Sequence, residues 1–234
     1  MNPPNHSETP RAFTLMELLA AVAILGILAA MLMPVIGATQ RTSTQAACAS
    51  NMRQIILALH QYAGDHGQLL PAAKSSQFLA WTRDTELLQY LPRRSAVNEF
   101  GIEGLWENAV FVCPESVANT GRRRRELRVT YAATAAIFGN EGTDKTVARH
   151  VLSINHPSRT PFLFETKPGD YVNGGYFKTW AEVSPDIATQ DPARMTTLDF
   201  LHRGAMNVGM LDGSVRMLDP QAFRDFTEDQ WKGL

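Results

Sequence analysis

The fold of this chain is decided at its amino-terminal end by the stretch RAFTLMELLAAVAILGILAAMLM, residues 11–33. Glu17 stands at the start of an apolar run, and no further charged residue occurs from Leu18 to Met33. The 21 residues from Phe13 to Met33 form a helix of about 31 Å, which matches the roughly 30 Å hydrocarbon core of a bilayer. An acidic side chain within such a helix costs about 2.5–3.5 kcal/mol. We therefore expect Glu17 to be kept for a specific partner.

The rest of the composition is that of one soluble domain of ordinary size joined to this helix. The chain has 234 residues and a formal net charge of −1, which argues against a protein held on nucleic acid by bulk charge. The only dense charge run is Arg122 to Arg125. Because no aromatic side chains interleave with it, a solvated loop is favoured over a DNA-binding surface. Nucleic acid is therefore not expected as a partner.

The sequence contains no motif that predicts catalysis or a bound cofactor. The HExxH, GxSxG and P-loop patterns are all absent. The two cysteines, Cys48 and Cys113, have neither CxxC spacing nor a cysteine–histidine cluster around them. We therefore expect neither a structural zinc domain nor a disulfide-dense miniprotein. We therefore predict no catalytic residue, no metal and no cofactor.

After the apolar run, the pattern becomes that of an amphipathic helix. Apolar residues recur at three- and four-residue steps, namely Ala47, Met52, Ile55, Ile56, Leu59, Tyr62 and Ala63. Gly64 and Gly67 end this pattern. The sequence thus predicts one helix in two parts, a membrane-embedded part over 13–38 and an amphipathic part over 39–64. A globular domain over 65–234 follows.

Near the carboxyl end, two apolar alternating runs at 206–211 and 214–218 flank Asp212-Gly213. An Asp-Gly pair between such runs is the strongest short-range signal for a β-hairpin with a two-residue type I′ turn. This turn needs a positive φ at both central residues, which glycine adopts freely and aspartate tolerates. The sequence therefore predicts a hairpin that turns at Asp212 and Gly213.

His202 lies at the foot of the first of these two strands. We expect its ring to fix the strand to a neighbouring strand through a hydrogen bond. The alternative is a metal or catalytic cluster of His202, Asp199 and Asp212. That cluster is disfavoured because Asp212 lies about 30 Å from His202 along an extended strand, too far for one ion to reach both.

The residues around Glu17 resemble a known processing signal. The stretch AFTLMELL, residues 12–19, resembles the cleavage and methylation site of type IV prepilins and type II secretion pseudopilins. The resemblance implies that a membrane prepilin peptidase cuts between Ala12 and Phe13 and methylates the new amino group of Phe13. Residues 1–12 are then a leader, and Glu17 is an assembly residue that pairs with the α-amino group of an adjacent subunit. The alternative is a plain anchor helix with Glu17 at the level of the lipid head groups.

Further segments, in the same order, resemble large prepilin-like proteins that carry a C-terminal H-X9-DG motif. They are CASNMRQI at 48–55, FVCP at 111–114, PSRTPFLFE at 157–165, and His202 followed after nine residues by Asp212-Gly213. The resemblance implies a pilin-like α+β fold, in which a long amino-terminal helix packs on a mainly antiparallel sheet with loop insertions. His202, Asp212 and Gly213 are then residues of a structural motif.

Cys48 and Cys113 both follow the predicted membrane helix and would share an oxidising compartment after export. A bridge between them would close a loop of about 65 residues and contribute about 4 kcal/mol in the chain-entropy model. The alternative is two separate buried thiols. We expect the disulfide, because an exported protein leaves buried thiols unpaired less often.

Together these features predict a structural subunit of a type II secretion pseudopilus or a type IV pilus-like fibre. It would cross the inner membrane once and export its C-terminal domain to the periplasm or the cell surface. Its expected partners are the prepilin peptidase, other pilin or pseudopilin subunits, the inner-membrane assembly platform and membrane lipid. The alternative is a membrane-anchored exported enzyme or polymer-binding protein that uses the helix only as an anchor. Such a protein needs a convergent polar cleft, which the sequence does not reveal.

Overall fold

The computed structural model describes residues 15–71, 87–91, 109–121, 130–134, 136–138, 150–167, 177–178 and 198–234, with the side chains of 32–38, 88, 109, 120, 177 and 178 excepted. The chain divides into two compact units, residues 1–43 and residues 44–234. The predicted leader 1–12, the predicted processing residue Phe13 and the arginine run at 122–125 lie outside the described residues. What the sequence predicts for them stays a prediction.

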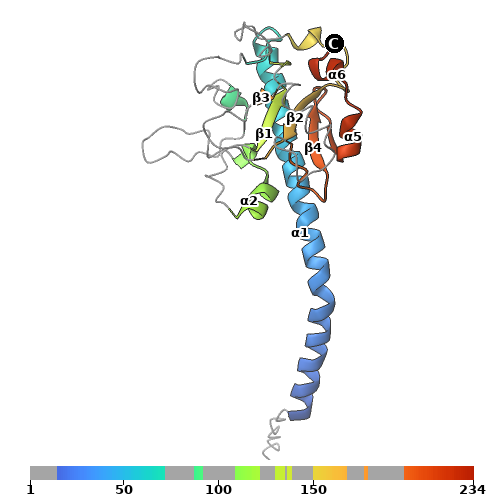
Figure 1. The fold of residues 1–234 in the computed structure, drawn as a ribbon. Coiled ribbons are helices and arrows are strands. Elements are labelled where there is room, and N and C mark those ends of the chain that lie inside the picture. Colours follow the sequence, from blue (N-terminus) through green and yellow to red (C-terminus); the bar gives the residue numbers. More distant parts are fainter. Residues whose placement is uncertain are drawn as a thin grey trace, which may run out of the picture. The chain divides into compact units, whose positions relative to one another are not determined.

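The longest element is helix α1, Leu15–Asp65, which begins in the first unit and ends in the second (Figure 1). Its end coincides with the predicted glycines. The backbone beyond Asp65 is left-handed at Gly67 (φ 63°) and at Gln68 (φ 66°). The Gln68 N–H group donates to the Ala63 carbonyl at 2.6 Å, which satisfies a carbonyl that the helix leaves open at its end.

In the first unit, all described side chains are exposed, from residue 15 to residue 31 and at residues 39–43. The large apolar ones are between 52% and 80% exposed: Leu15, Met16, Leu18, Leu19, Val22, Ile24, Leu25, Ile27, Leu28 and Met31. Among the described residues, no helix combines the length and the apolar character that crossing a bilayer requires. The predicted span, 13–33, extends past the described side chains at both of its ends.

The second unit contains a five-stranded sheet in the order β3-β1-β2-β4-β5. The strands are β1 Tyr131–Thr134, β2 Pro161–Glu165, β3 Phe177–Lys178, β4 Met206–Met210 and β5 Val215–Leu218. The pairs β1–β2, β2–β4 and β4–β5 are antiparallel, whereas β3 pairs parallel with β1. The predicted α+β class with a mainly antiparallel sheet is confirmed. The other described elements are α2 Pro114–Thr120, α5 Pro220–Arg224, α6 Glu228–Lys232 and the 3-10 turns Leu87–Tyr90, Ala109–Phe111 and Val151–Ser153.

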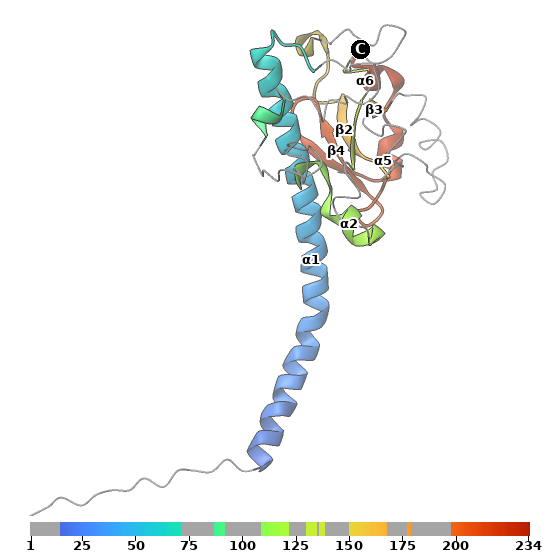
Figure 2. The same cartoon turned by 90° about the vertical axis from the view of Figure 1, so that its left-hand side faces the viewer.

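Successive side chains of a strand point to opposite faces of the sheet. Both faces carry buried apolar side chains here, and helices cover both of them. In Figure 2, α1 lies on one face, and α5 and α6 lie on the other. The cluster under α1 includes Met52, Ile55, Ile56, Leu59, Tyr131, Ala133 and Phe162. The cluster under α5 and α6 includes Ala132, Phe164, Met206, Val208, Met210, Phe223 and Trp231. The second unit is therefore a three-layer arrangement with the sheet in the middle.

Gly209 lets α1 approach the sheet closely. It lies in the middle of β4 and, by the alternation of that strand, on the face that α1 covers. A Cβ atom at this position would lie 2.5 Å from Ile56 Cδ1 and 3.0 Å from Met52 Sδ. Only a residue without a side chain fits under these two helix residues as they are packed.

The predicted β4–β5 hairpin is present, but its turn differs from the prediction. The Met210 N–H donates to the Ser214 carbonyl at 2.8 Å, and the Gly213 N–H donates to the Met210 carbonyl at 3.0 Å, so three residues form the loop. Of these three, Gly213 alone has a positive φ, 89°. This geometry is typical of a type I turn followed by a bulge glycine. The predicted two-residue type I′ turn at Asp212-Gly213 is therefore wrong.

A two-residue type I′ turn does occur, immediately before β4. Arg203 (φ 56°) and Gly204 (φ 83°) both have the positive φ that this turn requires. The N–H of His202 donates to the Ala205 carbonyl at 2.8 Å, and the N–H of Ala205 donates back at 3.0 Å. The turn thereby pairs His202 with Ala205, the residue before β4.

Replacement of Gly209 by alanine tests the close approach of α1. The Gly209→Ala protein should lose about 1–3 kcal/mol of unfolding free energy, because the added methyl group overpacks Ile56 and Met52. Denaturant unfolding of the full chain in detergent, followed by circular dichroism, measures the change. Gly64→Ala is the matched control, since nothing lies within 4 Å of a Cβ there, and it should be neutral or stabilising by about 0.5–1 kcal/mol. Equal stability of the Gly209→Ala protein and the parent would contradict the packing described.

Candidate functional site

A buried carboxylate lies at the end of β2. Glu165 is the last residue of that strand and is fully buried. Its Oε1 atom lies 2.9 Å from His202 Nε2 and accepts a hydrogen bond from Asn207 Nδ2 at 3.1 Å. Its Oε2 atom accepts the backbone N–H of Asn207 at 2.8 Å. A buried charge costs several kcal/mol unless it is paired and hydrogen-bonded, so these contacts are what allows a carboxylate here.

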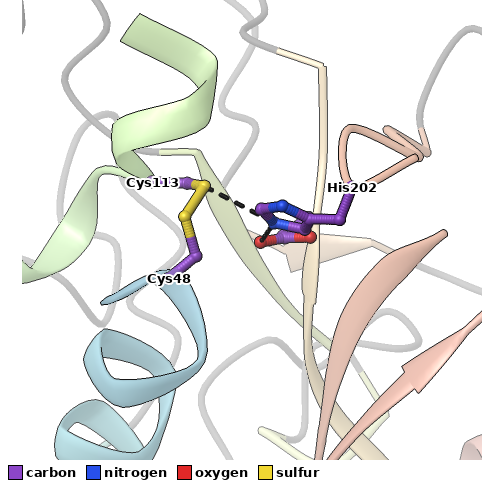
Figure 3. A group of neighbouring side chains, drawn as sticks. Cys48, Cys113 and His202 are labelled. Carbon is purple, nitrogen blue, oxygen red and sulfur yellow. Dashed lines mark hydrogen bonds and ion pairs between the residues drawn. A yellow bond between two sulfur atoms is a disulfide. The ribbon is translucent and has the colours of Figure 1, made fainter. Parts of the chain in front are cut away.

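A disulfide between Cys48 and Cys113 lies beside the His202 ring (Figure 3). The two cysteine Cα atoms are 4.9 Å apart, and Cys113 Sγ lies 3.7 Å from His202 Nε2. Both cysteines are fully buried. This is the pairing expected from the sequence, and it links α1 covalently to the residue that precedes α2. We refer to Cys48, Cys113, Glu165, His202 and Asn207 as the buried cluster.

Local hydrogen bonds position the parts of the buried cluster. The Cys113 N–H donates to Thr130 Oγ1 at 2.7 Å, which ties the start of α2 to the residue before β1. The Tyr131 hydroxyl donates to the Cys48 carbonyl at 3.2 Å, which ties α1 to β1. The type I′ turn holds His202. Elements far apart in the sequence therefore meet at one point, between α1 and the sheet.

The carboxylates also determine the charge on His202. Burial disfavours its charged form, but the hydrogen bond and the negative charge of Glu165 outweigh burial and raise the pKa of His202 above its ordinary 6.5. Asp199 lies near the same charges. Burial raises the pKa of Asp199 from 3.8 to about 6, with Glu165 adding to the rise and Lys167 and His202 opposing it.

Four members of the buried cluster carry atoms that bind metal ions. One ligand atom from each of Cys48, Cys113, Glu165 and His202 lies within 4.8 Å of all the others. In the disulfide form the two sulfurs are bonded to each other and are not free thiols. The cluster then presents a buried ion pair next to a disulfide.

The residues predicted from the sequence fall into two places. The expected ring hydrogen bond of His202 to a neighbouring strand is present, with Glu165 of β2 as its partner. Asp212 instead belongs to the β4–β5 loop, where its Oδ1 atom accepts the Ser214 N–H at 2.9 Å and the Ser214 hydroxyl at 2.7 Å. The histidine and the Asp-Gly pair of the H-X9-DG motif therefore do separate work, in a charge pair and in a turn.

Sequence reasoning missed Glu165 and Asn207 as members of the site. Glu165 ends the strand PFLFE, in which it is the only charged residue and all five residues are buried. A single acidic residue at the end of an otherwise apolar strand is the signal that could have found it, because a charge buried there needs a partner.

The amino-terminal site lies mostly outside the described residues. Ala12 and Phe13 are not among them, whereas Glu17 lies in the first turn of α1 and is exposed. The apolar residues that follow Glu17 are exposed as well.

Comparison with known proteins bears on this amino-terminal site. Residues 10–33 match the family model of the prokaryotic N-terminal methylation motif. The amino terminus is therefore of the prepilin type, as its residues predicted, and is consistent with a type IV pilin-like or pseudopilin-like protein. No curated protein and no solved structure matches the chain. The family match does not extend into the globular unit, so the resemblance to H-X9-DG proteins stays a prediction.

The raised pKa of His202 predicts how the stability depends on pH. Because the folded state binds the His202 proton more tightly than the unfolded state, this contribution is complete below pH 6.5 and is lost as pH rises through the folded pKa. The unfolding free energy of the parent should fall from pH 6.5 upward, whereas a His202→Gln protein should lose this part of the slope. Denaturant titrations between pH 5 and 9 measure both.

A matched control is His156→Gln, which removes an exposed histidine outside the buried cluster. It should keep the parent slope. If the parent and the His202→Gln protein had the same slope above pH 6.5, the coupling of His202 to Glu165 would be refuted.

Proposed function

We propose that this chain is a prepilin-like structural subunit of a type II secretion pseudopilus or a type IV pilus-like fibre. A prepilin peptidase removes residues 1–12 and methylates Phe13. The mature subunit then waits in the inner membrane with one pass and an exported C-terminal domain. An assembly platform moves it from lipid into the fibre. In this proposal the chain acts by assembly and not as an enzyme.

The observation that carries the proposal is the position of the methylation motif on an uncovered apolar helix. The motif spans residues 10–33, and the described side chains of 15–31 within it are exposed. Soluble monomers rarely expose a continuous apolar surface of this extent, which is typical of membrane or protein interaction sites. A helix that first lies in lipid and then packs against other subunits would use the same surface twice.

Glu17 gives this helix a specific partner in the proposed fibre. Cleavage before Phe13 creates an α-amino group that is cationic near neutral pH. The carboxylate of Glu17 in one subunit can pair with the amino group of its neighbour. Pairing offsets part of the cost of burying each charge and fixes how far one helix is shifted along the next.

The disulfide supports export of the second unit. Disulfides form and persist in oxidising compartments and are rare in the cytosol. The bond between Cys48 and Cys113 lies in the unit that follows the apolar helix. This arrangement fits an amino-terminal anchor with the globular unit on the oxidising side of the membrane.

Mass spectrometry of the mature amino terminus tests the processing step. The protein is extracted from membranes of a host that has its own prepilin peptidase, and a host lacking the peptidase is the control. We expect a chain that begins at N-methylated Phe13 in the first host and an uncut chain in the second. If the first host instead yields a chain that retains residues 1–12, the anchored enzyme or polymer-binding protein becomes the better hypothesis.

Glu17→Leu tests assembly separately from processing. The variant should still be cut before Phe13, but its incorporation into fibres should fall by about a hundredfold or more, because loss of one partner from a buried charge pair costs about 3–5 kcal/mol. Sheared fibres and membranes are compared by immunoblot. Met16→Leu is the matched control, as an apolar exchange beside Glu17, and it should assemble normally. Normal incorporation of the Glu17→Leu subunit would contradict the pairing argument.

A further inference from the structure

We propose that the buried cluster is a zinc site when its disulfide is reduced, with Cys48, Cys113, Glu165 and His202 as the four ligands. Reduction and metal binding would then alternate with disulfide formation at one place in the fold. The inference rests on the geometry of the second unit and does not depend on the proposed function.

The distances within the cluster suit a tetrahedral ion. The four ligand atoms already lie within 4.8 Å of one another. Bonds of about 2.3 Å from zinc to sulfur and about 2.0–2.1 Å to nitrogen and oxygen place neighbouring ligand atoms about 3.4–3.8 Å apart. Cys113 Sγ and His202 Nε2 are 3.7 Å apart, and His202 Nε2 and Glu165 Oε1 are 2.9 Å apart. The large change required is therefore the separation of the two bonded sulfurs.

The donor types also suit zinc. Two thiolates, one imidazole and one carboxylate are all zinc ligands, and four protein ligands without an open position are typical of a structural site. Four protein ligands complete a tetrahedral site without water. All four residues are also buried. Asn207 supports the carboxylate through its side-chain and backbone N–H groups. Such outer contacts orient metal ligands and strengthen binding.

The switch between the two states is a thiol–disulfide exchange followed by metal binding. A dithiol reductant exchanges with the Cys48–Cys113 bond and becomes a cyclic disulfide, which leaves two protein thiols. Zinc then binds both sulfurs as thiolates, and the two thiol protons pass to solvent. His202 coordinates through Nε2 and keeps its ring proton on Nδ1, so the proton that Nε2 shared with Glu165 passes to solvent as a third proton. Reoxidation by a disulfide oxidant removes two electrons from the thiolates, re-forms the sulfur–sulfur bond and releases the ion.

Cobalt titration of the full chain in detergent tests the site, because tetrahedral cobalt bound to sulfur gives visible d–d bands and a near-ultraviolet charge-transfer band. After reduction with a phosphine and removal of the reductant, one cobalt ion per chain should bind with both signatures, and zinc should displace it. The oxidised chain should show neither signature. A reduced chain that stays folded and binds no cobalt through sulfur would overturn the proposal.

Two variants separate the buried cluster from adventitious binding by thiols. Loss of an outer contact typically lowers metal affinity by about 10–100-fold. His202→Gln removes a ligand, so it should lower cobalt affinity by more than this. His156→Gln, which lies outside the cluster, should bind as the parent does. Equal affinity of both variants would refute the role of His202.

If reduction unfolds the second unit, circular dichroism measures whether zinc refolds it. Zinc should then restore the native spectrum of the reduced parent, and magnesium should not, because the metal would supply folding free energy in place of the disulfide. A reduced chain that unfolds and stays unfolded in zinc would likewise overturn the proposal.

Discussion

The carboxylate of Glu165 lies in the interior between α1 and the sheet, where an unpaired charge costs several kcal/mol. Much of the surrounding structure follows from this one requirement. The strand beside β2 presents the backbone N–H of Asn207, the second residue of β4, to the carboxylate. The chain must also turn sharply before β4 so that the His202 ring can reach the same carboxylate, and the type I′ turn at Arg203-Gly204 does this. The disulfide then closes the side of the ring that faces α1.

Helix α1 shows how one regular element serves two environments. Up to Ser43 its described side chains are exposed, and from Cys48 onward a stripe of them is buried against the sheet. The sequence predicts this difference well, because the first part is apolar all around and the second is apolar on one stripe only. The end of the helix near Gly67 and the prepilin-type amino terminus could be predicted for the same reason, whereas the class of fold was implied by the resemblance to prepilin-like proteins. The first two depend on residues close together in the sequence.

The types of the two turns near β4 could not be predicted from the local sequence. Asp212-Gly213 has the better local signal for a type I′ turn, yet Arg203-Gly204 adopts it. Arginine has no local preference for a positive φ, so contacts distant in the sequence decide the matter. The pairing of Glu165 with His202 and Asn207 holds residues 202–207 in place, and the contact of Gly209 with α1 fixes the register of the hairpin that follows. The buried cluster could not be predicted as a whole, because its members come from four segments that only the tertiary fold brings together.

The disulfide has a mechanical consequence for any process that pulls on the amino-terminal helix. The second unit begins at Thr44, and Cys48 is bonded to Cys113 only four residues later. A load applied along α1 therefore reaches a covalent link to the body of the unit before it reaches most of the helix residues that pack on the sheet. The helix cannot be peeled from the sheet one turn at a time, because force passes through the sulfur–sulfur bond to the segment at α2. Resistance to forced unfolding depends on the rate of unfolding and not on equilibrium stability alone. A crosslink at the point of entry acts on that rate directly.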